Sequence, residues 1–88
     1  MHEHKHENTK AVLNRLSRAI GHLESVKRMV EDDRDCAEVL VQLAAVRGEL
    51  SNTAKVILKD HMEPCVAHAE EGDESMLLEL NNAIDKFL

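Results

Sequence analysis

The chain has 88 residues, enough for one small domain that buries only part of its surface, so self-association would add to its stability. It has no Trp, no Tyr and a single Phe, and this composition is typical of packed helices rather than of a β-sandwich or barrel. The net charge is -6, yet residues 1–30 carry +3 and the remainder -9, which restricts a polyanionic partner to the first helix. Apolar runs are too short for a signal peptide or a membrane span. We therefore expect a cytoplasmic protein with one domain over residues 1–88.

A His-rich arm, residues 1–6, opens the chain and is expected to be flexible. After it, from about Glu7 to about Val30, apolar residues recur at steps of three and four, which predicts an amphipathic helix. Its expected apolar side consists of Leu13, Leu16, Ile20, Leu23, Val26 and Val30. Basic residues lie beside this stripe, and His22 is expected on the surface, as is His68 further along the chain.

A long second helix follows the acidic cluster "EDDRD", in which Asp33 or Asp35 can cap its start. Gly72 is its expected stop, although Pro64 predicts a bend or an earlier end. Its expected buried stripe is Cys36, Val39, Leu43, Val46, Leu50, Ala54, Ile57, His61 and Cys65. Two thiols and an imidazole thus share one face with the apolar residues.

A short third helix is predicted after Asp73, which is placed to cap it. Its apolar side is expected to be Met76 or Leu77, followed by Leu80, Ile84 and Phe87. The predicted fold class is therefore all-α, with three helices per chain.

The Cys and His residues of the second helix suggest a metal site. His61 and Cys65 stand at i and i+4 and can hold one ion, but Cys36 lies 25 residues earlier, on the order of 37 Å along a helix. Each residue alone is more often a core residue than a ligand. If two copies of the helix pack antiparallel, however, Cys36 of one subunit meets His61 and Cys65 of the other. The spacing therefore predicts a homodimer with intersubunit metal sites.

Two thiolates and one imidazole suit Cu(I) in trigonal geometry, whereas a fourth nitrogen would allow Ni(II) or Zn(II). His2, His4 and His6 in the arm are candidates for that nitrogen, although such arms are also common as loose tethers. Cu(I) is the first choice, because the three residues alone complete its preferred geometry.

Over nearly its whole length the chain resembles the CsoR/RcnR family of metal-sensing bacterial repressors. The resemblance rests on "LNRLSRAIGHLESVKRMVE", "DCAEVLVQLAAVRGEL" and "DHMEPC", together with the Cys36, His61 and Cys65 triad of the copper sensors. It implies a dimer of dimers that binds operator DNA when metal-free and releases it on binding metal, so that an efflux gene is expressed. It also implies that His4 matches the additional ligand of the nickel and cobalt branch, which makes Ni(II) or Co(II) the alternative ion.

DNA binding is expected on the basic strip of the first helix, with Lys10, Arg15, Arg18 and, from the second helix, Arg47 as candidates. Two arginines alone would more often be a solvated helix face, and only the resemblance and the charge asymmetry favour DNA. An alternative of another class is a cytosolic metal buffer or chaperone that binds no DNA. An enzyme is not expected, because no nucleophile motif accompanies the Cys and His residues.

Overall fold

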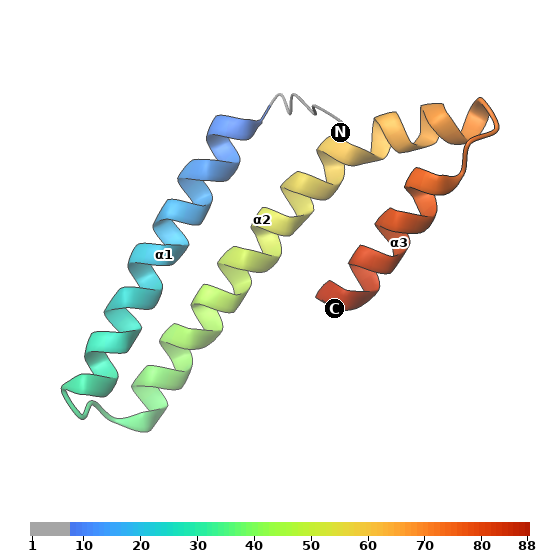
Figure 1. Ribbon diagram of the computed structural model, residues 1–88. Coiled ribbons are helices and arrows are strands. Elements are labelled where there is room, and N and C mark those ends of the chain that lie inside the picture. Colours follow the sequence, from blue (N-terminus) through green and yellow to red (C-terminus); the bar gives the residue numbers. More distant parts are fainter. Residues whose placement is uncertain (1–7) are drawn as a thin grey trace. The chain divides into compact units, whose positions relative to one another are not determined.

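The computed structural model describes the backbone of residues 8–88, together with the side chains of these residues apart from 61–66 and 68. It contains three helices, α1 (Thr9–Glu31), α2 (Cys36–Glu70) and α3 (Ser75–Phe87), and no strand within residues 8–88 (Figure 1). The all-α prediction is confirmed. The His-rich arm, with His2, His4 and His6, lies outside the described residues.

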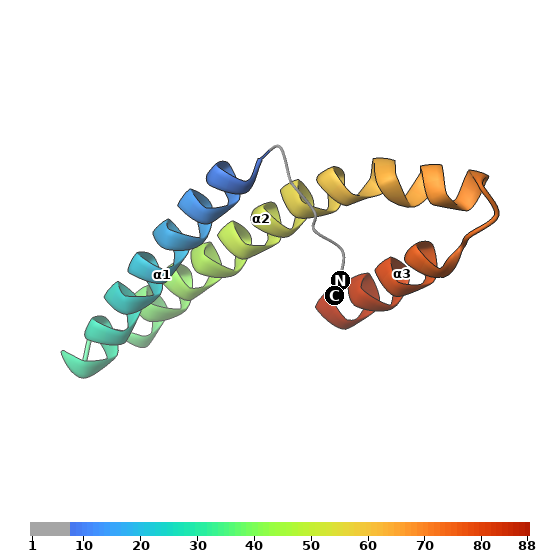
Figure 2. The same cartoon turned by 45° about the horizontal axis from the view of Figure 1, so that its top comes forward.

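The chain divides into two compact units, the first ending at Ile57 and the second spanning Leu58–Leu88. In the first unit, α1 and the adjoining part of α2 lie side by side and antiparallel, as both views show (Figures 1 and 2). The expectation of a single domain over the whole chain stays a prediction. None of the described helices combines the length and the apolarity needed to cross a membrane.

The core of the first unit is narrow. Ala19 and Val26 of α1 and Val46 and Thr53 of α2 are the buried residues at this helix contact. Small and β-branched side chains allow the two helices to approach closely, and each buried methyl contributes to their association. Most of the long apolar side chains predicted for the core are instead exposed in the single chain.

The turn between α1 and α2 is closed by backbone hydrogen bonds. The Asp33 N–H donates to the carbonyl of Val30 (3.1 Å) and the Arg34 N–H to that of Met29 (3.0 Å), while Asp33 itself has φ 59°. This is the hydrogen-bond pattern of a Schellman ending, with an aspartate at the left-handed position that glycine usually fills. Asp33 therefore ends α1, and Asp35, whose carbonyl accepts from the Val39 N–H (3.1 Å), stands immediately before α2.

The second unit is a helical hairpin formed by the end of α2 and by α3. Gly72, at φ 92°, ends α2 as predicted, and the Ser75 N–H donates to Asp73 Oδ1 (3.0 Å) at the start of α3. α2 is continuous to Glu70, so it does not end early at Pro64, and the alternative, a bend at this residue, stays a prediction. Phe87 is 55% exposed, against expectation, whereas the other predicted apolar positions of α3 are half-buried: Met76, Leu77, Leu80 and Ile84.

Candidate functional site

The face of α2 that carries Cys36 is exposed in the single chain. Cys36 is the first residue of the helix and a free, exposed cysteine. The large apolar residues that follow it on this face are exposed as well, to between 38% and 44%, namely Leu43, Leu50 and Ile57. Among the stripe residues from Cys36 to Ile57, all of which the structure describes, only Val46 is fully buried, and Val39 and Ala54 are half-buried. The predicted stripe therefore splits into an inner row that packs on α1 and an outer row that includes Cys36.

α1 shows the same division. Val26 of the predicted stripe is buried and Leu16 is half-buried, while the other four residues are 48% to 60% exposed: Leu13, Ile20, Leu23 and Val30. Their spacing of seven, three and seven residues keeps them on one side of the helix. An apolar surface of this kind is typical of a contact with another protein chain.

The other predicted metal ligands can be placed only by their position in the chain. His61 and Cys65 belong to the last turns of α2, at i and i+4 of one continuous helix, but their side chains lie outside the described residues, and so does His4. Within the part of the chain that the structure describes, no three His, Cys, Asp or Glu side chains gather to hold a metal. A thiol that stands exposed at one end of α2, with a helical His and Cys pair near the other, is compatible with a site completed by a second chain.

His22 is not the surface residue that we expected from the sequence. It is half-buried between α1 and α2, with its Nδ1 2.7 Å from Glu49 Oε1 and its Nε2 2.8 Å from Gln42 Oε1. Both neighbours are acceptors, so both ring nitrogens donate when the imidazole is protonated. The hydrogen bond with Gln42, followed by that with Glu49, raises the pKa of His22 above 6.5. The sequence did contain a signal for this placement. His22 stands three residues after Ala19 and four before Val26, which puts it on the side of α1 that packs against α2.

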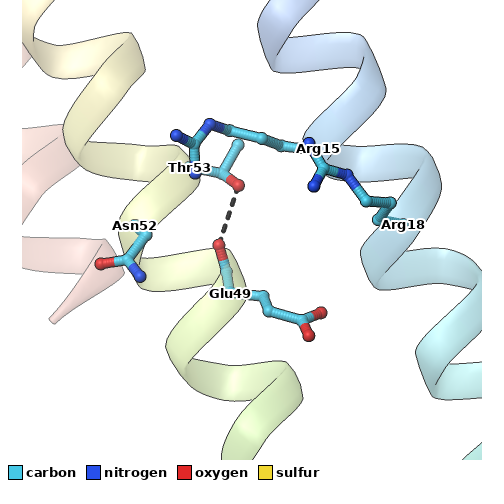
Figure 3. A pocket seen from close by; sticks show the side chains of 5 residues that line it. All are labelled: Arg15, Arg18, Glu49, Asn52 and Thr53. Atoms are coloured by element: carbon cyan, nitrogen blue, oxygen red, sulfur yellow. Dashed lines mark hydrogen bonds between the residues drawn. The ribbon is translucent and has the colours of Figure 1, made fainter.

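A small pocket of about 130 Å³ lies between α1 and α2 and is lined in part by Glu49, the partner of His22 (Figure 3). Arg15 and Arg18 reach into it from α1, and the side chain of Glu49 extends from α2 towards α1 on another side of the pocket. Asn52 and Thr53 complete its α2 side, where Thr53 Oγ1 donates to the backbone carbonyl of Glu49 (2.8 Å). The pocket thus combines two guanidinium groups, one amide and one carboxylate.

The four predicted DNA-binding residues are distributed over both helices of the first unit. All four are exposed, and Arg15 and Arg18 line the pocket, whereas Lys10 and Arg47 do not contribute to it. Sequence reasoning did not identify Glu49 and Asn52 as their neighbours. The signal was available in part, because an antiparallel hairpin that pairs His22 with Glu49 brings Arg18, four residues before His22, opposite Thr53, four residues after Glu49.

Comparison with known proteins gives a consistent result. Residues 8–86 match the family model described as "metal-sensitive transcriptional repressor". The copper-sensing transcriptional repressor CsoR of Bacillus subtilis is 40% identical over 93 residues, which cover 97% of this chain and 92% of the relative. The CsoR of Mycobacterium ulcerans is 43% identical over 72% of this chain and 54% of its own length.

Two solved structures resemble the fold over 99% of the chain. The nickel-responsive transcriptional regulator InrS has a TM-score of 0.79 and 48% sequence identity, and all of its chain is covered. The Cu(I)-bound copper-sensing repressor CsoR of Geobacillus thermodenitrificans has a TM-score of 0.83 and 34% identity over 93% of its chain. The fold is therefore shared by a copper sensor and a nickel sensor, and does not by itself distinguish the two metals.

Proposed function

The chain belongs to the metal-sensitive transcriptional repressor family, also called CsoR/RcnR, and on that premise we propose that it binds operator DNA when metal-free and releases the DNA on binding metal between two subunits. The family consists of metal-sensing transcriptional repressors rather than enzymes.

The outer row of α2 carries the proposal. Cys36 shares this exposed face with Leu43, Leu50 and Ile57. In sequence, His61 and Cys65 follow Ile57 at steps of four, which keeps them on the same face of the helix. An apolar row that remains exposed in one chain gains stability when a second copy covers it. Antiparallel pairing of two such rows about a two-fold axis brings Cys36 of one chain to the end of α2 that bears His61 and Cys65 in the other.

The proposed ligands are Cys36 from one subunit and His61 and Cys65 from the next. Two thiolates and an imidazole are a sufficient set for Cu(I) and would supply the soft donors that this ion prefers. Ni(II) is the second candidate, since the nickel-responsive InrS is 48% identical over 99% of this chain. Ni(II) in planar geometry needs a fourth donor, and His4 is the residue that we propose for it.

DNA is proposed to bind the basic strip of α1. Arg15, Arg18 and Lys10 are exposed there, in the one part of the sequence whose net charge is positive, and Arg47 adds a charge from α2. The strip contains no aromatic residue, so recognition would depend on phosphate contacts and DNA shape. Repetition of the strip in a dimer of dimers would multiply these contacts and make binding steeply dependent on salt.

Release of DNA requires that the metal bind one arrangement of the subunits better than another. A ligand set that is divided between two chains provides this preference, because closing the site fixes the position of one α2 against the other. In each chain the proposed DNA-binding strip lies on α1, and α1 packs against α2. The metal would thus change the spacing of the strips without touching the DNA.

The test is a gel shift with DNA from upstream of the protein's own gene, with and without Cu(I), Ni(II), Co(II) and Zn(II). We expect a complex that dissociates on addition of the cognate ion. Cys36→Ala should keep the metal-free complex, which shows that it is folded, and lose the response to metal. A Cys36→Ala protein that releases DNA as the parent does would disprove the shared site. A parent protein that binds metal but no DNA would indicate the metal buffer instead.

A further inference from the structure

The pocket between α1 and α2 has a composition that the metal site does not explain. We propose that it binds one phosphate of the DNA backbone, with the Asn52 amide donating beside Arg15 and Arg18, and that Glu49 weakens this binding. The inference rests on the DNA binding proposed above and assigns to α2 a DNA contact beyond that of Arg47.

The pocket is large enough for a phosphate group. Its volume is about 130 Å³, whereas one water molecule needs only about 10–15 Å³ on this measure. Both guanidinium groups extend from α1 towards α2 (Figure 3). Within residues 8–60, neither Arg15 nor Arg18 forms an ion pair, so their N–H groups are available to an anion. Bidentate recognition of phosphate is a common use of arginine.

Asn52 is the neutral donor that the pocket offers. The neighbouring residue, Thr53, is only 2% exposed, and its hydroxyl already donates to the backbone carbonyl of Glu49. Asn52 is exposed, and its amide carries two N–H groups. Side-chain amides are among the groups that commonly contact DNA phosphates. A phosphate between the two arginines and Asn52 would receive donors from both helices of the hairpin.

Glu49 opposes such an anion. One of its carboxylate oxygens contacts His22, and the other, Oε2, is buried with no hydrogen-bond partner among the described side chains. A carboxylate that lines the same pocket repels a phosphate and attracts the arginines to itself. The two guanidinium groups exceed this single negative charge, so that the pocket remains attractive to a phosphate but is weaker than it would be without Glu49.

The first variant is Asn52→Ala, measured by DNA binding of the metal-free protein at several salt concentrations. We expect affinity for operator and for unrelated duplex to fall by about 3- to 10-fold, with the salt slope unchanged because no charge is removed. Arg15→Ala should weaken binding and reduce that slope by about one for each phosphate that the variant no longer neutralises. Asn82→Ala, at an exposed asparagine of α3, is the matched control and should bind as the parent does.

The second variant, Glu49→Gln, should act in the opposite direction. Gln keeps an oxygen that can accept from His22 but removes the negative charge, so we expect DNA affinity to rise by about 3- to 10-fold. Circular dichroism and the oligomeric state of both variants should match the parent. Parent-like DNA binding by Asn52→Ala overturns the phosphate contact, and unchanged or weaker binding by Glu49→Gln overturns the role of the carboxylate.

These outcomes are separate from those of the proposed function. If the parent binds no DNA, the proposed function fails and the phosphate contact fails with it. If the parent binds DNA and releases it with metal, but Asn52→Ala and Glu49→Gln behave as the parent does, only the phosphate contact fails. Affinity for metal, measured in the same variants, should remain unchanged in either case.

Discussion

His22 Nδ1 and Glu49 Oε1 are 2.7 Å apart and join α1 to α2 beside the buried contact of Ala19, Val26 and Val46. The second ring nitrogen of His22 is held by Gln42, also from α2. An imidazolium with two acceptors satisfies every donor that it carries, whereas a neutral ring leaves one nitrogen without a proton to donate. The hairpin is therefore more stable when His22 is charged.

This pair predicts a pH dependence of stability. The pKa of His22 is raised in the folded chain above 6.5, so its stabilising contribution is complete below the unfolded pKa and is lost as the pH rises through the folded pKa. Denaturant unfolding between pH 5 and roughly pH 8 should show a free energy that declines through this range. His22→Gln should show a smaller decline than the parent, with the other histidines unchanged as an internal control. Equal slopes for parent and variant would contradict the prediction.

The end of α1 offers a stabilising substitution. Asp33 has φ 59°, a conformation that costs a non-glycine residue free energy, although aspartate tolerates it better than most residues. Asp33→Gly removes this cost but adds entropy to the unfolded chain, so we expect a net gain of about 0.5 kcal/mol in the free energy of unfolding. Asp32→Gly is the matched control, because Asp32 has φ -86° and gains nothing from glycine. It should be destabilised by about 0.5–1 kcal/mol. The opposite order in thermal or denaturant unfolding would refute this account.

Helix periodicity was sufficient to predict the three helices, because the apolar steps of three and four are local signals. The residues that end the helices, at "EDDRD" and Gly72, are local signals as well. It did not separate the two apolar rows of each helix, since residues that pack within a chain and residues that pack between chains obey the same spacing. Val26 and Ile20 illustrate the problem, for only Val26 is buried at the contact with α2. The His22 and Glu49 contact was missed for a related reason, namely that pairing across a hairpin depends on a register that single-helix patterns do not contain. The metal ligands remain predictions.

The outer row of α1 predicts self-association. Ile20 is 60% exposed in the single chain and lies between Leu13 and Leu23 on the same side. Ile20→Glu would place a charge in this apolar row of α1, so we expect subunit association to weaken by at least about 100-fold, while helix content is retained. Ala11→Glu adds the same charge at an exposed position outside this row and should assemble as the parent does. Sedimentation equilibrium distinguishes the two, and an Ile20→Glu protein with parent-like assembly would show that another surface holds the subunits together.

The role of His4 can be separated from that of the triad by using two metals. Cu(I) is satisfied by two thiolates and one imidazole, whereas planar Ni(II) requires a fourth donor. We therefore expect His4→Ala to retain Cu(I) binding and to lose about 10-fold or more in Ni(II) affinity, a loss typical of removing one ligand or its support. His2→Ala and His6→Ala are matched controls in the same arm and should bind both ions as the parent does. X-ray absorption on the parent should show two sulfur donors with either ion, and one additional nitrogen with Ni(II). Undiminished Ni(II) affinity in His4→Ala would show that the fourth donor comes from elsewhere.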